Sequence, residues 1–202
     1  MSVLPDTTIS ALPATDTAAP IEQFRRMDKS TLEQWSAIGV EHMANQGRVA
    51  DRILMLLESL STVVDGFITD QLTHCLQTAT LAERAGADDE VVFASLCHDI
   101  GKAISVPNHP EIAAGIIKPY VRNEVYEMIL VHQDFQGRHY YAHFGADPDA
   151  REKHRGAIES FELAARFADE WDQQAFDPGY DTLPLAHFEP LVRAVFAKAQ
   201  GL

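Results

Sequence analysis

The chain has 202 residues, with 30 Asp and Glu against 16 Lys and Arg, which gives a formal net charge of -14. This acidity argues against nucleic acid and anionic membrane surfaces as partners, because both are bound through a surplus of Lys and Arg. The longest uncharged apolar run, 91–97, is far shorter than the roughly 20 residues of a membrane-spanning helix. With two cysteines and no visible secretory signal, the sequence predicts a cytoplasmic protein without a disulfide scaffold.

Helical patterns separated by Gly, Pro and Asp turn signals run along most of the chain. Residues 1–22 lack them and are small, polar and punctuated by Pro, so we expect a disordered tail. Ser30 and Glu33 form a capping box that predicts a helix ending near Gly47. Further helices are predicted over 49–60, 70–85, 90–100, 108–118, 122–135, 158–176 and 185–200. No stretch alternates as a strand does, so we predict one all-α domain, a helical bundle over 23–202.

The adjacent pair His98-Asp99 is the most informative feature of the sequence. It ends a helix whose preceding residues, 91–97, are apolar on nearly every face, which is typical of a helix buried all round. An ionised Asp in such a place costs several kcal/mol unless it is paired or bound to a metal. In isolation, the pair would be interpreted as a hydrogen-bonded His–Asp pair at a helix terminus.

Other predicted helices direct His or Asp side chains inward as well. His74 lies in the preceding helix, His109 begins the next one, and His132 shares a stripe with apolar residues. Asp172 continues the apolar stripe of Phe161, Ala165 and Ala168. Each of these residues alone is more often structural than a ligand, but such convergence is much less expected by chance.

The combined set contains imidazoles and carboxylates but no thiolate, which suits iron, manganese, cobalt or zinc. Six side chains are too many for one catalytic ion that keeps open positions, so they indicate two ions. Asp99 is the natural bridge, because a carboxylate has two oxygens. Cys75 and Cys97 are expected to point away from their histidine neighbours into the core.

The order His74, His98-Asp99, Asp172 resembles the H…HD…D pattern of the HD-domain superfamily of helical metalloproteins, over about half of the chain. The two further histidines, His109 and His132, are typical of its dinuclear members. The run 74–79, HCLQTA, is similar to the first-ligand segment of the mixed-valent diiron oxygenases, the group of myo-inositol oxygenase and the phosphonate-cleaving oxygenases. The aromatic residue before Asp172 is a second likeness to that group.

This resemblance implies an Fe2+/Fe3+ pair bridged by Asp99. One iron would be held by His74, His98, Asp99 and Asp172, and the other by His109 and His132. The string HD-x-G-K places Lys102 beside the substrate, as in the inositol type, although phosphohydrolases of the superfamily carry the same string. Residues 64–67, VDGF, lack the Tyr and Glu of the phosphonate-cleaving type, so the phosphonate contacts of that type cannot be transferred to this chain.

The first functional hypothesis is oxidation by O2 of a C–H bond in a small polar hydroxylated substrate. Lys102 would offset negative charge, Arg138 and His139 would hold an anionic group, and Gln136, Tyr140 and Tyr141 would line the pocket. Ordinary packing is the alternative explanation of this aromatic loop.

The second hypothesis is a phosphohydrolase that uses Mn, Co, Mg or Zn, with Lys102 and Arg138 on the phosphate oxygens. A third is a protein that is not an enzyme and holds a structural metal. A structural site would more often be closed and rich in sulfur.

Overall fold

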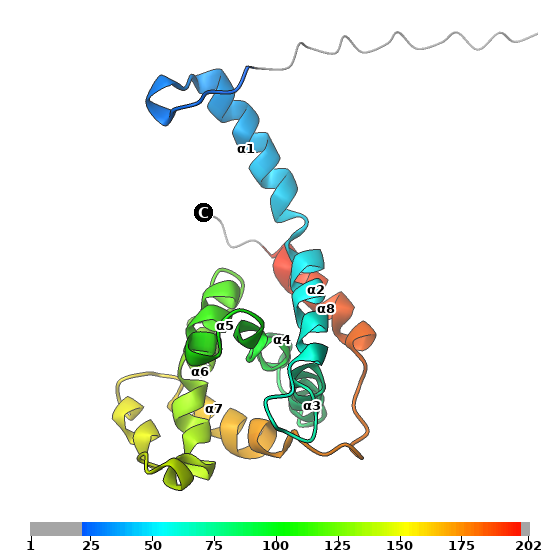
Figure 1. The fold of residues 1–202 in the computed structure, drawn as a ribbon, viewed down its shortest axis with the longest axis vertical. Coiled ribbons are helices and arrows are strands. Elements are labelled where there is room, and N and C mark those ends of the chain that lie inside the picture. Colours follow the sequence, from blue (N-terminus) through cyan, green and yellow to red (C-terminus); the bar gives the residue numbers. More distant parts are fainter. Residues whose placement is uncertain (1–21, 199–202) are drawn as a thin grey trace, which may run out of the picture. The chain divides into compact units, whose positions relative to one another are not determined.

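The computed structural model describes residues 22–198, and every regular element within this range is a helix (Figure 1). This confirms the predicted all-α fold class. The tail predicted over 1–22 falls, except for its last residue, outside the described residues. Contacts divide the chain into two units, Met1–Asn45 and Gln46–Leu202. Among the helices of the described range, none combines the length and the apolar character needed to cross a membrane.

The first unit contains most of helix α1 (Leu32–Gln46), which buries none of its residues. A capping box forms at its start, one residue later than predicted. The backbone N–H of Gln34 donates to Thr31 Oγ1, and the backbone N–H of Thr31 donates to Gln34 Oε1 at 2.8 Å. Ser30 is not the cap because its hydroxyl is already used, as it donates to Met27 O and accepts from Trp35 Nε1.

The second unit holds the other seven α-helices that the described residues form, and all but one of them lie close to their predicted ranges. They are α2 (Val49–Ser59), α3 (Gln71–Arg84), α4 (Asp89–Cys97), α5 (His109–Ile117), α6 (Asn123–Gln136), α7 (Phe161–Arg166) and α8 (Leu185–Ala197). Asp70 caps α3 by accepting from the Thr73 N–H, and Asp88 caps α4 in the same manner. Helix α3 packs on α4, α5 packs on α6, and α6 packs on α7.

The core lies between these helices and is closed by large aromatic side chains. Phe93, Phe135, Phe167 and Phe188 are fully buried, and Trp171 is nearly so. Each such burial contributes about 1.5–3 kcal/mol, so the helices that carry the His and Asp residues are firmly held. Helix α4 buries seven consecutive residues, Val91 to Cys97, as predicted for a helix that is apolar on nearly every face.

The long helix predicted over 158–176 is interrupted. After α7 the chain forms a π-helix over Phe167–Trp171 and then a 3-10 helix over Asp172–Gln174. The apolar stripe also differs from the predicted one. Ala164 is fully buried, whereas Ala165, which was predicted to lie on the stripe, is only half-buried. The wider turn still delivers Asp172 to the interior, and π-turns inside helices occur frequently at functional sites.

Candidate metal centre

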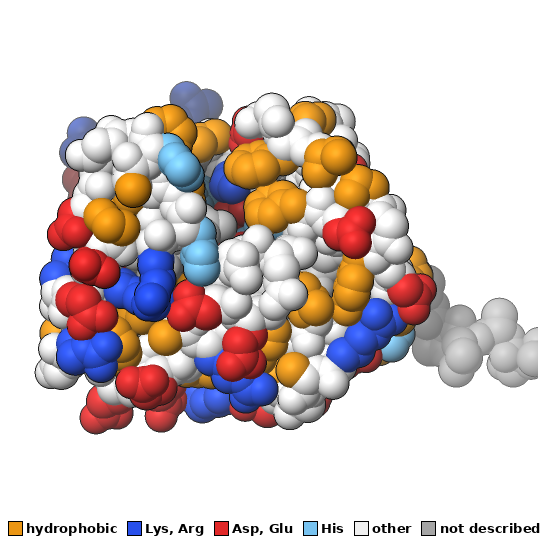
Figure 2. All heavy atoms as spheres, turned by 90° about the horizontal axis from the view of Figure 1, so that it is seen from below, with side chains coloured by type: hydrophobic (Ala, Val, Ile, Leu, Met, Phe, Trp, Pro, Cys, Tyr) orange, Lys and Arg blue, Asp and Glu red, His pale blue; other side chains and the backbone are white. Residues whose placement is uncertain are grey.

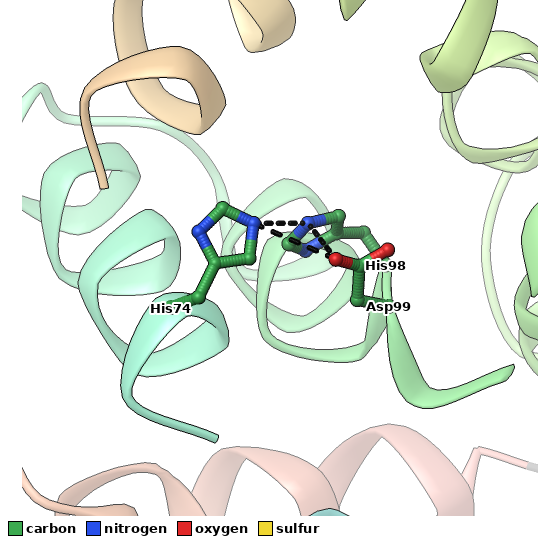
Figure 3. Close-up of side chains that lie close together, drawn as sticks. All are labelled: His74, His98 and Asp99. Carbon is green, nitrogen blue, oxygen red and sulfur yellow. Dashed lines mark hydrogen bonds and ion pairs between the residues drawn. The ribbon is translucent and has the colours of Figure 1, made fainter. Parts of the chain in front are cut away.

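The first group of converging side chains joins helices α3 and α4 to the segment after α7. His74 Nε2 lies 3.1 Å from His98 Nε2, and Asp172 Oδ1 lies 3.0 Å from the first nitrogen and 3.4 Å from the second. Asp99 Oδ2 lies 3.6 Å from His74 Nε2 and 3.4 Å from His98 Nε2. Figure 3 shows His74, His98 and Asp99 pointing toward one another. Three of the four residues meet the spacing expected of a metal-binding group.

The second group uses the other oxygen of the same carboxylate. Asp99 Oδ1 lies 3.1 Å from His109 Nε2 and 3.6 Å from His132 Nε2, and these two nitrogens are 3.2 Å apart. These three residues form a second buried group with metal-binding spacing. The structure thus brings together all six predicted ligands, with Asp99 between two pairs of histidines.

The four imidazoles are oriented in the same way, with Nδ1 on a backbone carbonyl and Nε2 toward the centre. The Nδ1 atoms contact the carbonyl oxygens of Ala175 (from His74), Ser95 (from His98), Val106 (from His109) and Ile129 (from His132), at 2.7–3.0 Å. Such bonds assign the proton to Nδ1 and leave a lone pair on each Nε2. Lone pairs that face one another at 3.1–3.2 Å repel unless a cation or proton lies between them. The donor set therefore fits a pair of metal ions.

The electrostatics of the cluster favour ionised carboxylates. Burial raises the pKa of Asp99, but the His98, His109 and His132 imidazoles outweigh it and hold that pKa well below its ordinary value. Burial likewise raises the pKa of Asp172, and His98 and His74 bring it below its ordinary value. The same two carboxylates raise the pKa of His98 well above its ordinary value against the effect of burial. A metal ion would take the place of that proton, since ligands bind in their deprotonated form.

Lys102 lies beside the Asp99 carboxylate and also contacts Gln71. Its Nζ is 2.7 Å from Asp99 Oδ2 and donates to Gln71 Oε1 at 3.1 Å. Burial lowers the pKa of Lys102, but Asp99 raises it above its ordinary value, so the side chain stays a cation. Gln71 is fully buried, and within the described range its Nε2 has no hydrogen-bond partner.

The segment after Asp172 is fastened to helix α3. Gln77 Nε2 donates to the Asp177 carbonyl at 2.7 Å, and its Oε1 accepts from the Asp177 N–H. The Phe176 ring stacks on the His74 ring with centroids 4.3 Å apart, and Phe67 stacks on the other face of Phe176 at 4.8 Å. These contacts fix the His74 ring and the Asp172 carboxylate relative to each other.

Gly101 allows the start of α5 to approach the end of α4. A Cβ at this position would lie 2.3 Å from the carbonyl oxygen of His109 and 2.7 Å from its Cα, closer than real Cβ atoms come. The glycine in the HD-x-G-K string therefore has a packing role. It brings His109 within reach of Asp99.

We expect Gly101→Ala to destabilise the protein by about 1–3 kcal/mol or more, because the overlap is with backbone that cannot rotate away. The substitution should also weaken metal binding, since His109 moves with the α5 backbone. Gly115→Ala, also in α5, is the control. A Cβ there meets nothing within 4 Å, and alanine should stabilise the helix slightly. Thermal unfolding with and without metal measures both, and equal melting temperatures for the two variants would contradict the packing role.

A pocket of about 580 Å³ opens beside the second histidine pair. It is lined by Asp65, Phe67, Lys102, Val106, Pro107, His109, Gln133, Gln136, His139, Tyr140, Phe144, Gln173 and Phe176. The face drawn in Figure 2 is hollowed, and hydrophobic side chains gather beside the recess. The sequence-predicted residues Lys102, Gln136, His139 and Tyr140 are among the lining residues.

Two predicted contacts of the aromatic loop lie outside the pocket, and a third, His139, lines it but is also paired with a carboxylate. Arg138 is exposed and Tyr141 is half-buried, and neither lines the pocket. His139 Nε2 lies 3.0 Å from Asp169 Oδ1, a carboxylate that also receives Arg151. This contact lies outside the metal cluster. Burial raises the pKa of Tyr140, which keeps its hydroxyl protonated in the pocket wall.

The residues that support the cluster were not predicted from the sequence, chiefly Gln71, Gln77, Phe67 and Phe176. Gln71 lies three residues before His74, on the same face of α3. A polar side chain at that spacing on a buried face was a usable signal. Phe67 and Phe176 lie in segments without periodicity, so the sequence carried no comparable signal for them.

A family model described as the HD domain matches residues 72–175. The match begins next to Gln71 and ends at Ala175, whose carbonyl oxygen contacts His74 Nδ1. It therefore encloses all six clustered side chains. Among the curated proteins, none matches the chain.

Proposed function

The chain belongs to the HD domain family, whose members are in general metal-dependent hydrolases or related enzymes, and from that premise we propose that it is a dinuclear diiron oxygenase. Its reaction would be the oxidation by O2 of a C–H bond in a small hydroxylated molecule. Asp99 would bridge the two ions, with His74, His98 and Asp172 on one and His109 and His132 on the other.

The observation that carries this proposal is the small cationic charge of the pocket. Lys102 is the one Lys or Arg among the lining residues, and Asp99 already faces it at 2.7 Å. Three of the other polar lining groups are amides, Gln133, Gln136 and Gln173, and the rest are Asp65, His109, His139 and Tyr140. Amides bind hydroxyl groups by donating and accepting hydrogen bonds, whereas phosphate oxygens are bound most strongly by cationic donors such as Arg and Lys.

The residues of the chain have distinct parts in the proposed mechanism. When bound, two iron ions would supply Lewis-acid activation of a substrate hydroxyl and the electron transfer that O2 requires. Lys102 would hold its proton at Nζ beside the bridging carboxylate and stabilise negative charge that develops on substrate oxygen. The glutamine amides and the Tyr140 hydroxyl would orient the substrate. Phe67 and Phe176 would exclude water from the His74 side.

Hydrolysis of a phosphorylated small molecule is the second candidate, and family membership is the observation that favours it. The same six ligands would then hold Mn, Co, Mg or Zn, and Lys102 would bind a phosphate oxygen. This alternative requires the ions themselves to supply most of the positive charge, because Arg138 lies outside the pocket.

Metal analysis and electron paramagnetic resonance separate the two candidates. Protein purified in air is expected to hold two irons per chain and, after partial reduction, to give a coupled mixed-valence signal. It should consume O2 with members of a panel of diols and polyols. Robust phosphatase or phosphodiesterase turnover with Mn, Co or Mg, together with no O2 uptake on the panel, would overturn the oxygenase.

Lys102 and Gln71 give a linked prediction. Lys102→Met should lower turnover about 100-fold at unchanged metal content, because it removes one charge-stabilising group. Gln71→Leu should lower turnover about 10-fold, since Gln71 acts only through the position of Lys102. In the Lys102→Met background, Gln71→Leu should then have little further effect. Steady-state rates of the single and double variants test this, and fully additive losses would exclude the coupling.

A further inference from the structure

The pocket beside the metal centre has more room and more apolar wall than a small polyol uses. Its 580 Å³ fall within the roughly 300–1,000 Å³ of pockets that enclose drug-sized ligands. Lys102 and His109 lie at its inner end, where the Lys102 side chain is 12% exposed and that of His109 is 6% exposed. The polar groups that face the reaction centre are thus the least exposed part of the lining.

The outer part of the lining is open to solvent and holds three exposed apolar side chains beside the polar Asp65, His139 and Gln173. Phe67 is 46% exposed, Val106 is 48% exposed and Phe144 is 80% exposed, and all three line the pocket. Exposed apolar side chains grouped around an opening commonly mark a binding surface, because leaving them in water is unfavourable. Phe67 is held in place by its stack on Phe176, so this wall is partly formed before a ligand arrives.

Resting on the proposed function, we propose that the substrate is a hydroxylated molecule with an apolar body. Its hydroxylated end faces Lys102 and His109, and its apolar body lies against Phe67, Val106 and Phe144. A molecule that is polar over its whole surface leaves these three side chains in water and gains nothing from them. The apolar contact therefore sets specificity by size and hydrophobicity, apart from the chemistry at the metal ions.

A series of vicinal alkanediols, from propanediol to octanediol, tests this inference by calorimetry. The metal-loaded protein is titrated without O2, so that binding is measured apart from turnover. The dissociation constant should fall about two- to fourfold for each added methylene that enters the pocket. Glycerol and myo-inositol should bind more weakly than octanediol. An affinity that does not depend on chain length would overturn the inference.

A matched pair of variants locates the apolar contact. Phe144→Ser should flatten the dependence of the diol dissociation constant on chain length. The fold does not depend on the Phe144 ring, because this side chain is highly exposed. Met55→Ser removes another exposed apolar side chain, 68% exposed on α2, that does not line this pocket. It should leave the dependence intact. The same dependence in both variants would place the apolar contact elsewhere and refute the assignment.

The outcomes also separate this inference from the proposed function. A steep diol series with no O2 uptake in air would refute the oxygenase while the apolar site remains. O2 uptake with polyols, at an affinity that does not change with chain length, would refute the apolar body while the oxygenase remains.

Discussion

Asp99→Asn is expected to abolish binding of both metal ions and to lower turnover at least about 10³-fold. Each oxygen of Asp99 faces a different histidine pair, at 3.4–3.6 Å on one side and 3.1–3.6 Å on the other. The amide that replaces it is neutral and keeps one weak acceptor, so both groups lose an anionic ligand in one step. Loss of several kcal/mol of transition-state stabilisation corresponds to this factor.

The measurement is metal content per chain after gel filtration, together with turnover. Asp181→Asn is the matched control, since the Asp181 side chain is 94% exposed and pairs with Arg84 at the surface. Circular dichroism of the metal-free proteins excludes unfolding as the cause. This check is needed because Asp99→Asn removes the carboxylate partner of Lys102, and breaking a buried pair costs stability. Full retention of two ions by Asp99→Asn would refute the bridge.

The convergence of the six candidate ligands was predictable because it follows from helical periodicity. His74 and His132 lie on buried faces of regular helices, and His98 and Asp99 end a helix that is apolar all round. Once such faces pack into one core, their polar side chains must meet. The capping box at Thr31 and the π-turn before Asp172 were not predictable in the same way. In these places competing local hydrogen bonds decide the geometry.

The pocket was the part least accessible from sequence. Its lining comes from short segments around Phe67, Val106 and Phe176, which have no period and meet only in the folded chain. Arg138 illustrates the limit. It follows α6, and the 3-10 turn over Gly137–His139 leaves it exposed and outside the lining while His139 faces the pocket. In a tight turn, neighbouring side chains point in different directions, so the turn geometry decides which of them lines the pocket. The amino-acid composition does not reveal that geometry.

His109→Gln is expected to leave one metal ion and to remove the other. Only Asp99 Oδ1 and His132 would remain at the second position, whereas His74, His98 and Asp172 at the first are untouched. Gln is close to His in size, and His109 begins α5 rather than lying inside it, so the fold should tolerate the change. Turnover should fall at least about 100-fold, because a two-ion mechanism loses one ion.

The diagnostic result is a change in stoichiometry with a change in spectrum. Metal content should fall from two ions to one, and the coupled mixed-valence signal should give way to that of an isolated ferric ion. His187→Gln, at a surface histidine paired with Glu83 at 3.0 Å, should retain both ions. His74→Gln should instead spare the His109–His132 position. Two variants that each lose a different single ion require two separate positions joined by Asp99, whereas one shared position predicts the same loss in both.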